Sequence, residues 1–83
     1  FLLPLAIIIA EDYLQLIVLL AAIFLVLIAE LFNTAIEAVV DRVGLDFHLL
    51  SGRAKDMGSA AVSLTILLFF IIWGIVVVEN FLP

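Results

Sequence analysis

Two carboxylates and an amide, those of Glu30, Glu37 and Asn33, form the strongest chemical signal in the chain. They follow seventeen residues, 13–29, in which Gln15 is the only strongly polar side chain. An ionisable side chain at or near a bilayer costs about 2.5–3.5 kcal/mol on insertion scales, so acids in this position indicate a functional site. At 100° per residue, all the polar side chains from 30 to 41 fall on one helical face, which also includes Thr34 and Asp41.

A second group of reactive side chains, Lys55, Asp56 and Ser59, lies within one helical turn at the start of the last apolar segment. Backbone N–H groups are unsatisfied at a helix start and favour anions, and a lysine supplies a point charge for a phosphate. Asp56 and Glu37 offer the hard oxygen ligands that Mg²⁺ prefers, usually together with substrate phosphates. A phosphate site facing carboxylates favours phosphoryl transfer, with Glu30, the most deeply placed acid, as the base for a lipid hydroxyl.

The glycines do not form a standard nucleotide-binding motif. The sequence has four glycines, Gly44, Gly52, Gly58 and Gly74. Their spacing matches neither GxxxxGK[ST] nor GxGxxG. Any ATP site in this chain must therefore be nonstandard.

The composition is that of a membrane protein. The chain has 83 residues, of which 69% are hydrophobic, and a mean hydropathy of +1.52, whereas ordinary soluble domains are roughly 45–50% apolar. A net charge of −5 with only three cations argues against nucleic acid as a partner. The lack of cysteine excludes disulfides and thiolate metal ligands. The expected fold class is an all-α membrane protein.

Three apolar segments predict a helical bundle with spans over about 1–10, 13–43 and 57–81, and residues 44–56 connect the last two. The first segment reaches only about 15 Å and cannot cross a hydrocarbon layer of about 30 Å, so we expect it to be the end of a truncated span. The second, at roughly 46 Å, should cross the membrane and project beyond it.

Polar residues mark the ends of these segments. Glu11 and Asp12 should form a tight turn that makes the second helix antiparallel to the first. Arg42 in the last turn and Gly44 just after it predict a helix stop, with the glycine in a left-handed cap. All three cations, at positions 42, 53 and 55, lie between the second and third spans, so the positive-inside rule places the connection in the cytoplasm.

Two segments, 29–42 (AELFNTAIEAVVDR) and 51–62 (SGRAKDMGSAAV), resemble the bacterial integral-membrane diacylglycerol kinases. The resemblance implies three transmembrane helices per subunit, an N-terminal surface helix and a homotrimer whose active sites are shared between subunits. It also implies an enzyme of the bacterial inner membrane that transfers the γ-phosphate of Mg-ATP to diacylglycerol, giving phosphatidic acid at the cytoplasmic face. No part of residues 1–83 corresponds to the surface helix, which in the family carries another acidic metal ligand.

The resemblance also implies roles for individual residues. Glu30 would be the general base and contact the lipid substrate, with Asn33 in the same site. Glu37 would be a magnesium ligand and contact the nucleotide. Ser59 would contact the lipid or its reacting hydroxyl.

Five further residues would bind ATP by the same resemblance. Lys55 and Asp56 would contact the phosphates and the metal, and Asp46, Phe47 and His48 would lie on the nucleoside side. Judged from the residues alone, Asp41 and Arg42 are better explained as helix-end capping and orientation than as catalytic groups.

Three alternatives compete with a diacylglycerol kinase. Undecaprenol kinases, a sister branch of the same family, share the glutamates of this polar helical face. Residues 52–59, however, look more like those of the diacylglycerol kinases. A small membrane transporter could use Glu30 as an ion-coupling acid, but its acid should lie near mid-membrane, whereas these acids run toward the cytoplasmic connection. A structural oligomerisation module would need only the small residues from Gly58 to Ser63, and it leaves the acids unexplained.

Overall fold

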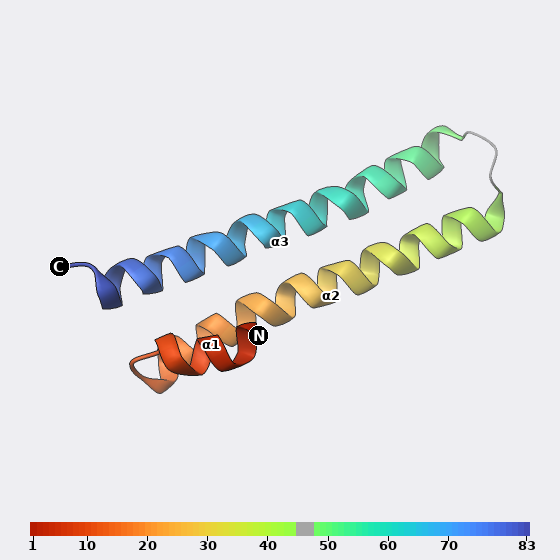
Figure 1. The fold of residues 1–83 in the computed structure, drawn as a ribbon. Coiled ribbons are helices and arrows are strands. Elements are labelled where there is room, and N and C mark those ends of the chain that lie inside the picture. The colour runs from red at the N-terminus through yellow and green to blue at the C-terminus, as the bar shows by residue number, and fades with distance from the viewer. Residues whose placement is uncertain (45–47) are drawn as a thin grey trace.

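The protein is a three-helix chain in which two long helices form an antiparallel hairpin. The computed structural model describes residues 1–44 and 48–83, which are all-helical apart from their turns and ends, as predicted. The helices are α1 (Leu2–Ile9), α2 (Tyr13–Val43) and α3 (Leu49–Phe81). Helices α2 and α3 lie side by side, and α1 folds back along the first part of α2 (Figure 1). The molecule measures 54 × 20 × 18 Å.

The turn between α1 and α2 is closed by reciprocal hydrogen bonds. Asp12 is the N-cap of α2, and its carboxylate accepts a hydrogen bond from the backbone N–H of Gln15 at 2.8 Å. The side chain of Gln15 in turn accepts from the backbone N–H of Glu11 at 3.0 Å. Such reciprocal capping satisfies donors that a helix start leaves free. The predicted reversal at Glu11 and Asp12 is confirmed, and α1 runs antiparallel to α2 (Figure 1).

Helix α2 ends at the expected residue, but the backbone angles of its C-cap differ from the prediction. Gly44 is the C-cap, and its N–H donates to the carbonyl of Val40 at 3.3 Å. Its φ of 170° and ψ of 156° are extended, so the predicted left-handed cap is wrong. Gly44 thus makes a helical hydrogen bond while its own backbone is extended. Arg42 does lie in the last turn, where a cation meets the negative end of the helix dipole.

Helix α3 begins earlier than predicted. It starts at Leu49, so residues 49–56, which we expected in the connection, are its first two turns. His48 is the N-cap, and its Nδ1 accepts from the backbone N–H of Leu50 at 3.1 Å. The expectation failed because the polar residues here mark the limit of the apolar segment and not the start of the helix. A helix of 33 residues is about 50 Å long, well beyond the roughly 30 Å of a hydrocarbon layer.

The packed core lies where all three helices meet. Its buried side chains come from α1, α2 and α3 and include Ala6, Leu19 and Trp73. The indole N–H of Trp73 donates to the carbonyl of Leu19 at 3.3 Å, and its ring stacks on Phe69 with centroids 5.1 Å apart. Trp73 therefore packs between the helices.

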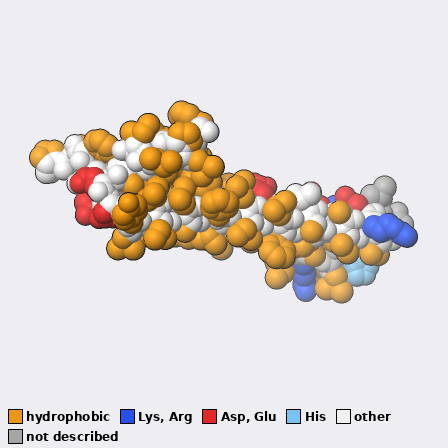
Figure 2. All heavy atoms as spheres, turned by 90° about the horizontal axis from the view of Figure 1, so that it is seen from below, with side chains coloured by type: hydrophobic (Ala, Val, Ile, Leu, Met, Phe, Trp, Pro, Cys, Tyr) orange, Lys and Arg blue, Asp and Glu red, His pale blue; other side chains and the backbone are white. Residues whose placement is uncertain are grey.

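Most other large apolar side chains are exposed on the single chain. Figure 2 shows hydrophobic side chains over much of one face, with Lys and Arg gathered toward one end. Helices α2 and α3 are each long and apolar enough to cross a membrane. With eight residues, α1 is too short to do so. This apolar surface suits lipid or neighbouring helices, as expected of a membrane protein.

A network of amides joins the three helices at the end far from the α2–α3 connection. Gln15 and Asn80 exchange side-chain hydrogen bonds of 3.1 and 2.8 Å. Asn80 Nδ2 also donates to the carbonyl of Ile9, at 3.0 Å. Interhelical hydrogen bonds of this kind contribute to helix association in membranes, where apolar contacts alone provide little driving force.

We expect Asn80→Leu to lower the free energy of unfolding by about 1 kcal/mol, because it removes the partner of Gln15 and the donor to Ile9. Unfolding in detergent micelles measures the change. Gln15→Leu should cost a similar amount. The double variant should cost less than the sum of the two, because each single change already breaks the pair. Additive costs would show that the two amides do not act together.

Candidate active site

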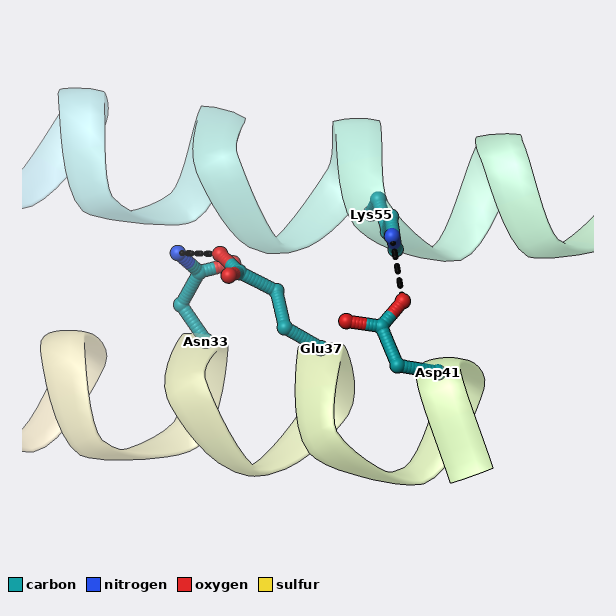
Figure 3. A network of polar contacts seen from close by, with 4 residues as sticks. All are labelled: Asn33, Glu37, Asp41 and Lys55. Atoms are coloured by element: carbon teal, nitrogen blue, oxygen red, sulfur yellow. Dashed lines mark hydrogen bonds and ion pairs between the residues drawn. The ribbon is translucent and has the colours of Figure 1, made fainter. Parts of the chain in front are cut away.

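Three residues of the polar face of α2 point toward the N-terminal part of α3. Asn33, Glu37 and Asp41 lie on successive turns of α2, and their side chains point toward α3 (Figure 3). Asn33 Nδ2 donates to Glu37 Oε1 at 2.9 Å. From α3, Lys55 Nζ reaches Asp41 Oδ1 at 2.7 Å. We call Asn33, Glu37, Asp41 and Lys55 the polar cluster. Antiparallel packing thus brings the stripe and the basic segment together at the connection end of the hairpin.

Asp41 has a specific partner that the sequence did not reveal. We expected this residue to serve helix capping and orientation, but it forms an ion pair with Lys55. Both side chains are about half exposed, at 49% and 43%. Lys55 lies outside the expected span 57–81, and the hydrogen bond that it donates to Asp41, helped by the charges of Asp41 and Glu37, raises the pKa of its ammonium above the ordinary value. Lys55 is therefore cationic at neutral pH.

The amide of Asn33 lies in the contact between the two helices. It packs against Gly58 of α3, which is buried. Its Oδ1 atom is buried and has no hydrogen-bond partner among the described residues. Glu37 is exposed and accepts from Asn33 through one oxygen, so its other lone pairs are free for a ligand.

Glu30 lies two helical turns from Glu37, on the side toward the middle of α2. It is exposed, and within the described residues its carboxylate has neither a hydrogen bond nor an ion pair. Asn33 and Val40, which are half-buried, mark the direction of α3. Glu30 points to the side of that direction, since residues advance by 100° around a helix. Glu30 therefore lies beside the α2–α3 contact, and its carboxylate is accessible from outside the hairpin.

The remaining expected site residues do not join the polar cluster. Asp56 and Ser59 are exposed on α3, and Asp56 is 100° around the helix from Lys55. His48 is exposed, with its Nδ1 engaged as the N-cap of α3. Asp46 and Phe47 lie outside the described residues.

Carboxylates in the described part of the chain do not form a complete metal site. No group of three or more His, Asp or Glu side chains gathers there. Magnesium usually binds one or two carboxylates together with substrate phosphates, and does not need an all-protein cage. Glu37, with its free oxygens beside the cationic Lys55, fits the role of one such ligand.

Comparison with known proteins identifies the family. The family described as Prokaryotic diacylglycerol kinase matches residues 1–77 of the chain. The chain belongs to this family. The resemblance of residues 29–42 and 51–62 is thereby confirmed.

Relatives in this family are named Diacylglycerol kinase. The protein of Escherichia coli K12 is 50% identical over 70 residues, which are 84% of this chain and 57% of the relative. The protein of Haemophilus influenzae is 44% identical over 73 residues, 88% of this chain and 62% of the relative. The protein of Pseudomonas aeruginosa is 52% identical over 54 residues, which are 65% of this chain and 44% of the relative. The chain thus spans less than two thirds of the length of these relatives.

We expect Asp41→Asn to change the free energy of unfolding by less than about 1 kcal/mol, because a half-exposed ion pair contributes little. Unfolding in micelles at low and high salt measures the change, and the difference from the unaltered protein should shrink as salt screens the pair. Lys55→Gln serves as the matched variant from the other side of the pair. A loss of several kcal/mol in either variant would mean that the pair is a structural requirement.

Proposed function

We propose that the protein is a Mg-ATP-dependent lipid kinase that phosphorylates diacylglycerol to phosphatidic acid in phospholipid metabolism. Membership of the family and the names of its relatives support this activity. The observation that carries it in this chain is the polar cluster, in which acids and an amide of α2 meet a lysine of α3 at the cation-bearing end of the hairpin. Phosphoryl transfer depends mainly on positioning and charge neutralisation, which is what such a cluster can supply.

The proposed reaction assigns one task to each charged group. The carboxylate of Glu30 accepts the proton of the lipid hydroxyl while the hydroxyl oxygen forms a bond to the γ-phosphorus of ATP. The bond from that phosphorus to the β,γ-bridging oxygen breaks, and ADP leaves. Lys55 stabilises the phosphate oxygens during this exchange, and Asp56 is proposed to contact the nucleotide as well. Magnesium, when bound, neutralises phosphate charge, and Glu37 would hold it.

Substrate contacts complete the proposal. Glu30 and Ser59 are proposed to meet the lipid, with Asn33 beside them. His48 would lie on the nucleoside side together with Asp46 and Phe47. In the single chain Glu30, Asp56 and Ser59 are exposed, and among the described residues no side-chain hydrogen bond or ion pair joins them to the polar cluster. Their exposure leaves room for a second surface at the site.

We therefore propose a homotrimer in which active sites are shared between subunits. The exposure of Glu30, Asp56 and Ser59 supports a composite site, and the number three comes from the family resemblance. The proposed location is the bacterial inner membrane with the site on the cytoplasmic side. All three cations of the chain, at 42, 53 and 55, lie at the connection end of the hairpin, as the positive-inside rule requires of cytoplasmic residues.

The choice of lipid and the reaction itself can be tested together. The full-length protein in mixed micelles, given Mg²⁺ and ATP labelled in the γ-phosphate, should transfer label to diacylglycerol in preference to undecaprenol and ceramide. Label on undecaprenol alone would assign the chain to the undecaprenol kinases. Label on none of the three would remove the kinase proposal and leave a membrane transporter using Glu30 as the stronger candidate.

We expect Glu30→Gln to lower kcat by roughly 10²–10⁴-fold, because the amide cannot take up the hydroxyl proton. Binding of a non-hydrolysable ATP analogue should be retained, since Glu30 is placed on the lipid side of the site. Glu79→Gln is the matched control, because Glu79 is an exposed acid at the opposite end of the hairpin. Undiminished phosphorylation by Glu30→Gln would remove this residue from its assigned role.

A further inference from the structure

Gly58 of α3 lies directly against the amide of Asn33 from α2. A Cβ atom built on Gly58 would overlap Asn33 Oδ1 and would lie 3.4 Å from Asn33 Cγ and 3.5 Å from Ile36 Cδ1. At each of the other three glycines an added Cβ would meet nothing within 4 Å in the described part of the chain. Gly58 is therefore the glycine at which a side chain would displace a neighbour, and that neighbour belongs to the polar cluster.

The two ends of the Asn33 amide lie in different surroundings. The Nδ2 end donates to Glu37 Oε1 at 2.9 Å, whereas Oδ1 is buried and has no partner among the described residues. Only the NH₂ end can donate to a carboxylate, so the hydrogen bond to Glu37 turns the oxygen toward Gly58. Burying an oxygen without a partner is unfavourable. The orientation of Asn33 therefore depends on its hydrogen bond to Glu37 and on the space that Gly58 leaves open.

We propose that Gly58 is a positioning residue for the reaction. Its missing side chain provides the space in which the Asn33 amide sits, and the amide in turn holds the carboxylate of Glu37 toward a metal-bound nucleotide. The added methyl group would meet the far end of the Asn33 side chain, so it rotates the amide, and this rotation takes Nδ2 away from Glu37. The part of this inference that concerns the metal rests on the proposed function, whereas the contacts of Gly58 with Asn33 and of Asn33 with Glu37 do not.

The first test measures binding of Mn²⁺ in the presence of a non-hydrolysable ATP analogue, by electron paramagnetic resonance of the free ion. In Gly58→Ala the affinity should fall about 10–100-fold, the usual effect of losing a group that orients a metal ligand. Gly74→Ala is the matched control, since it makes the same change in open space on the same helix, and it should bind Mn²⁺ normally. Alanine is a better helix former than glycine, so neither change disfavours α3 itself.

A double variant separates positioning from general packing. Asn33→Ala should lose Mn²⁺ affinity to the same extent as Gly58→Ala, because it removes the donor to Glu37. Gly58→Ala combined with Asn33→Ala should lose no more than Asn33→Ala alone, because the overlap and the hydrogen bond are then both gone. A further loss in the double variant would overturn the proposal. So would normal affinity in Asn33→Ala, an outcome that decides the question even if Gly58→Ala alone does not fold.

A second readout is independent of nucleotide and lipid. The side-chain NH₂ resonance of Asn33, observed by nuclear magnetic resonance in micelles, should shift in Glu37→Gln as the acceptor changes. Gly58→Ala should move it as well, and Gly74→Ala should not. An unmoved resonance in Gly58→Ala would overturn the inference. Absence of kinase activity in the unaltered protein would overturn only the proposed function, because this resonance reports the contact directly.

Discussion

Antiparallel packing of α2 against α3 is the constraint on which the rest of the structure depends. Four contacts between the helices, Gln15 with Asn80, Leu19 with Trp73, Asn33 with Gly58 and Asp41 with Lys55, cover most of the hairpin. The two residue numbers of each pair add to between 91 and 96, so one register holds along the whole length. A shift of one turn at either end would move Lys55 from Asp41 and would place a bulkier residue than Gly58 against Asn33.

Much of this arrangement was predictable from the sequence because it depends on local chemistry. Apolar segments and helical periodicity give the all-α class and the polar stripe of α2, and the acidic turn at Glu11 and Asp12 gives the first reversal. The start of α3 was not predictable in the same way, because polarity reports where the hydrocarbon layer ends and a helix can continue past that point. The partner of Asp41 depends on the register of the hairpin, which the length of a connection alone does not determine.

Both long helices continue past their apolar segments, so the polar cluster lies on regular helix. Asn33, Glu37 and Lys55 are all carried by regular helix and not by a loop, so their Cα positions are determined by backbone hydrogen bonds within each helix. Groups on helices are held more precisely than groups on loops. Asp56 follows Lys55 directly in sequence, but one residue along a helix turns the side chain by 100°, so the two side chains leave α3 in different directions. Adjacency in sequence therefore does not by itself place Asp56 on the face of α3 that meets α2.

The two ends of the hairpin differ in how their polar groups are satisfied. At the far end, Gln15 and Asn80 bind each other, and Asn80 also binds Ile9 of α1, so the amides are paired within the chain. At the connection end, Glu30 and Asp56 are exposed without partners among the described residues, and Asn33 buries an oxygen that accepts no hydrogen bond there. Polar groups paired within the chain contribute to stability, whereas unpaired acids beside a lysine are available to a ligand. Under the proposed function, the chemistry lies at the connection end. The close contact at Gly58 matters there because Asn33 is the group through which the packing of the helices reaches the carboxylate of Glu37.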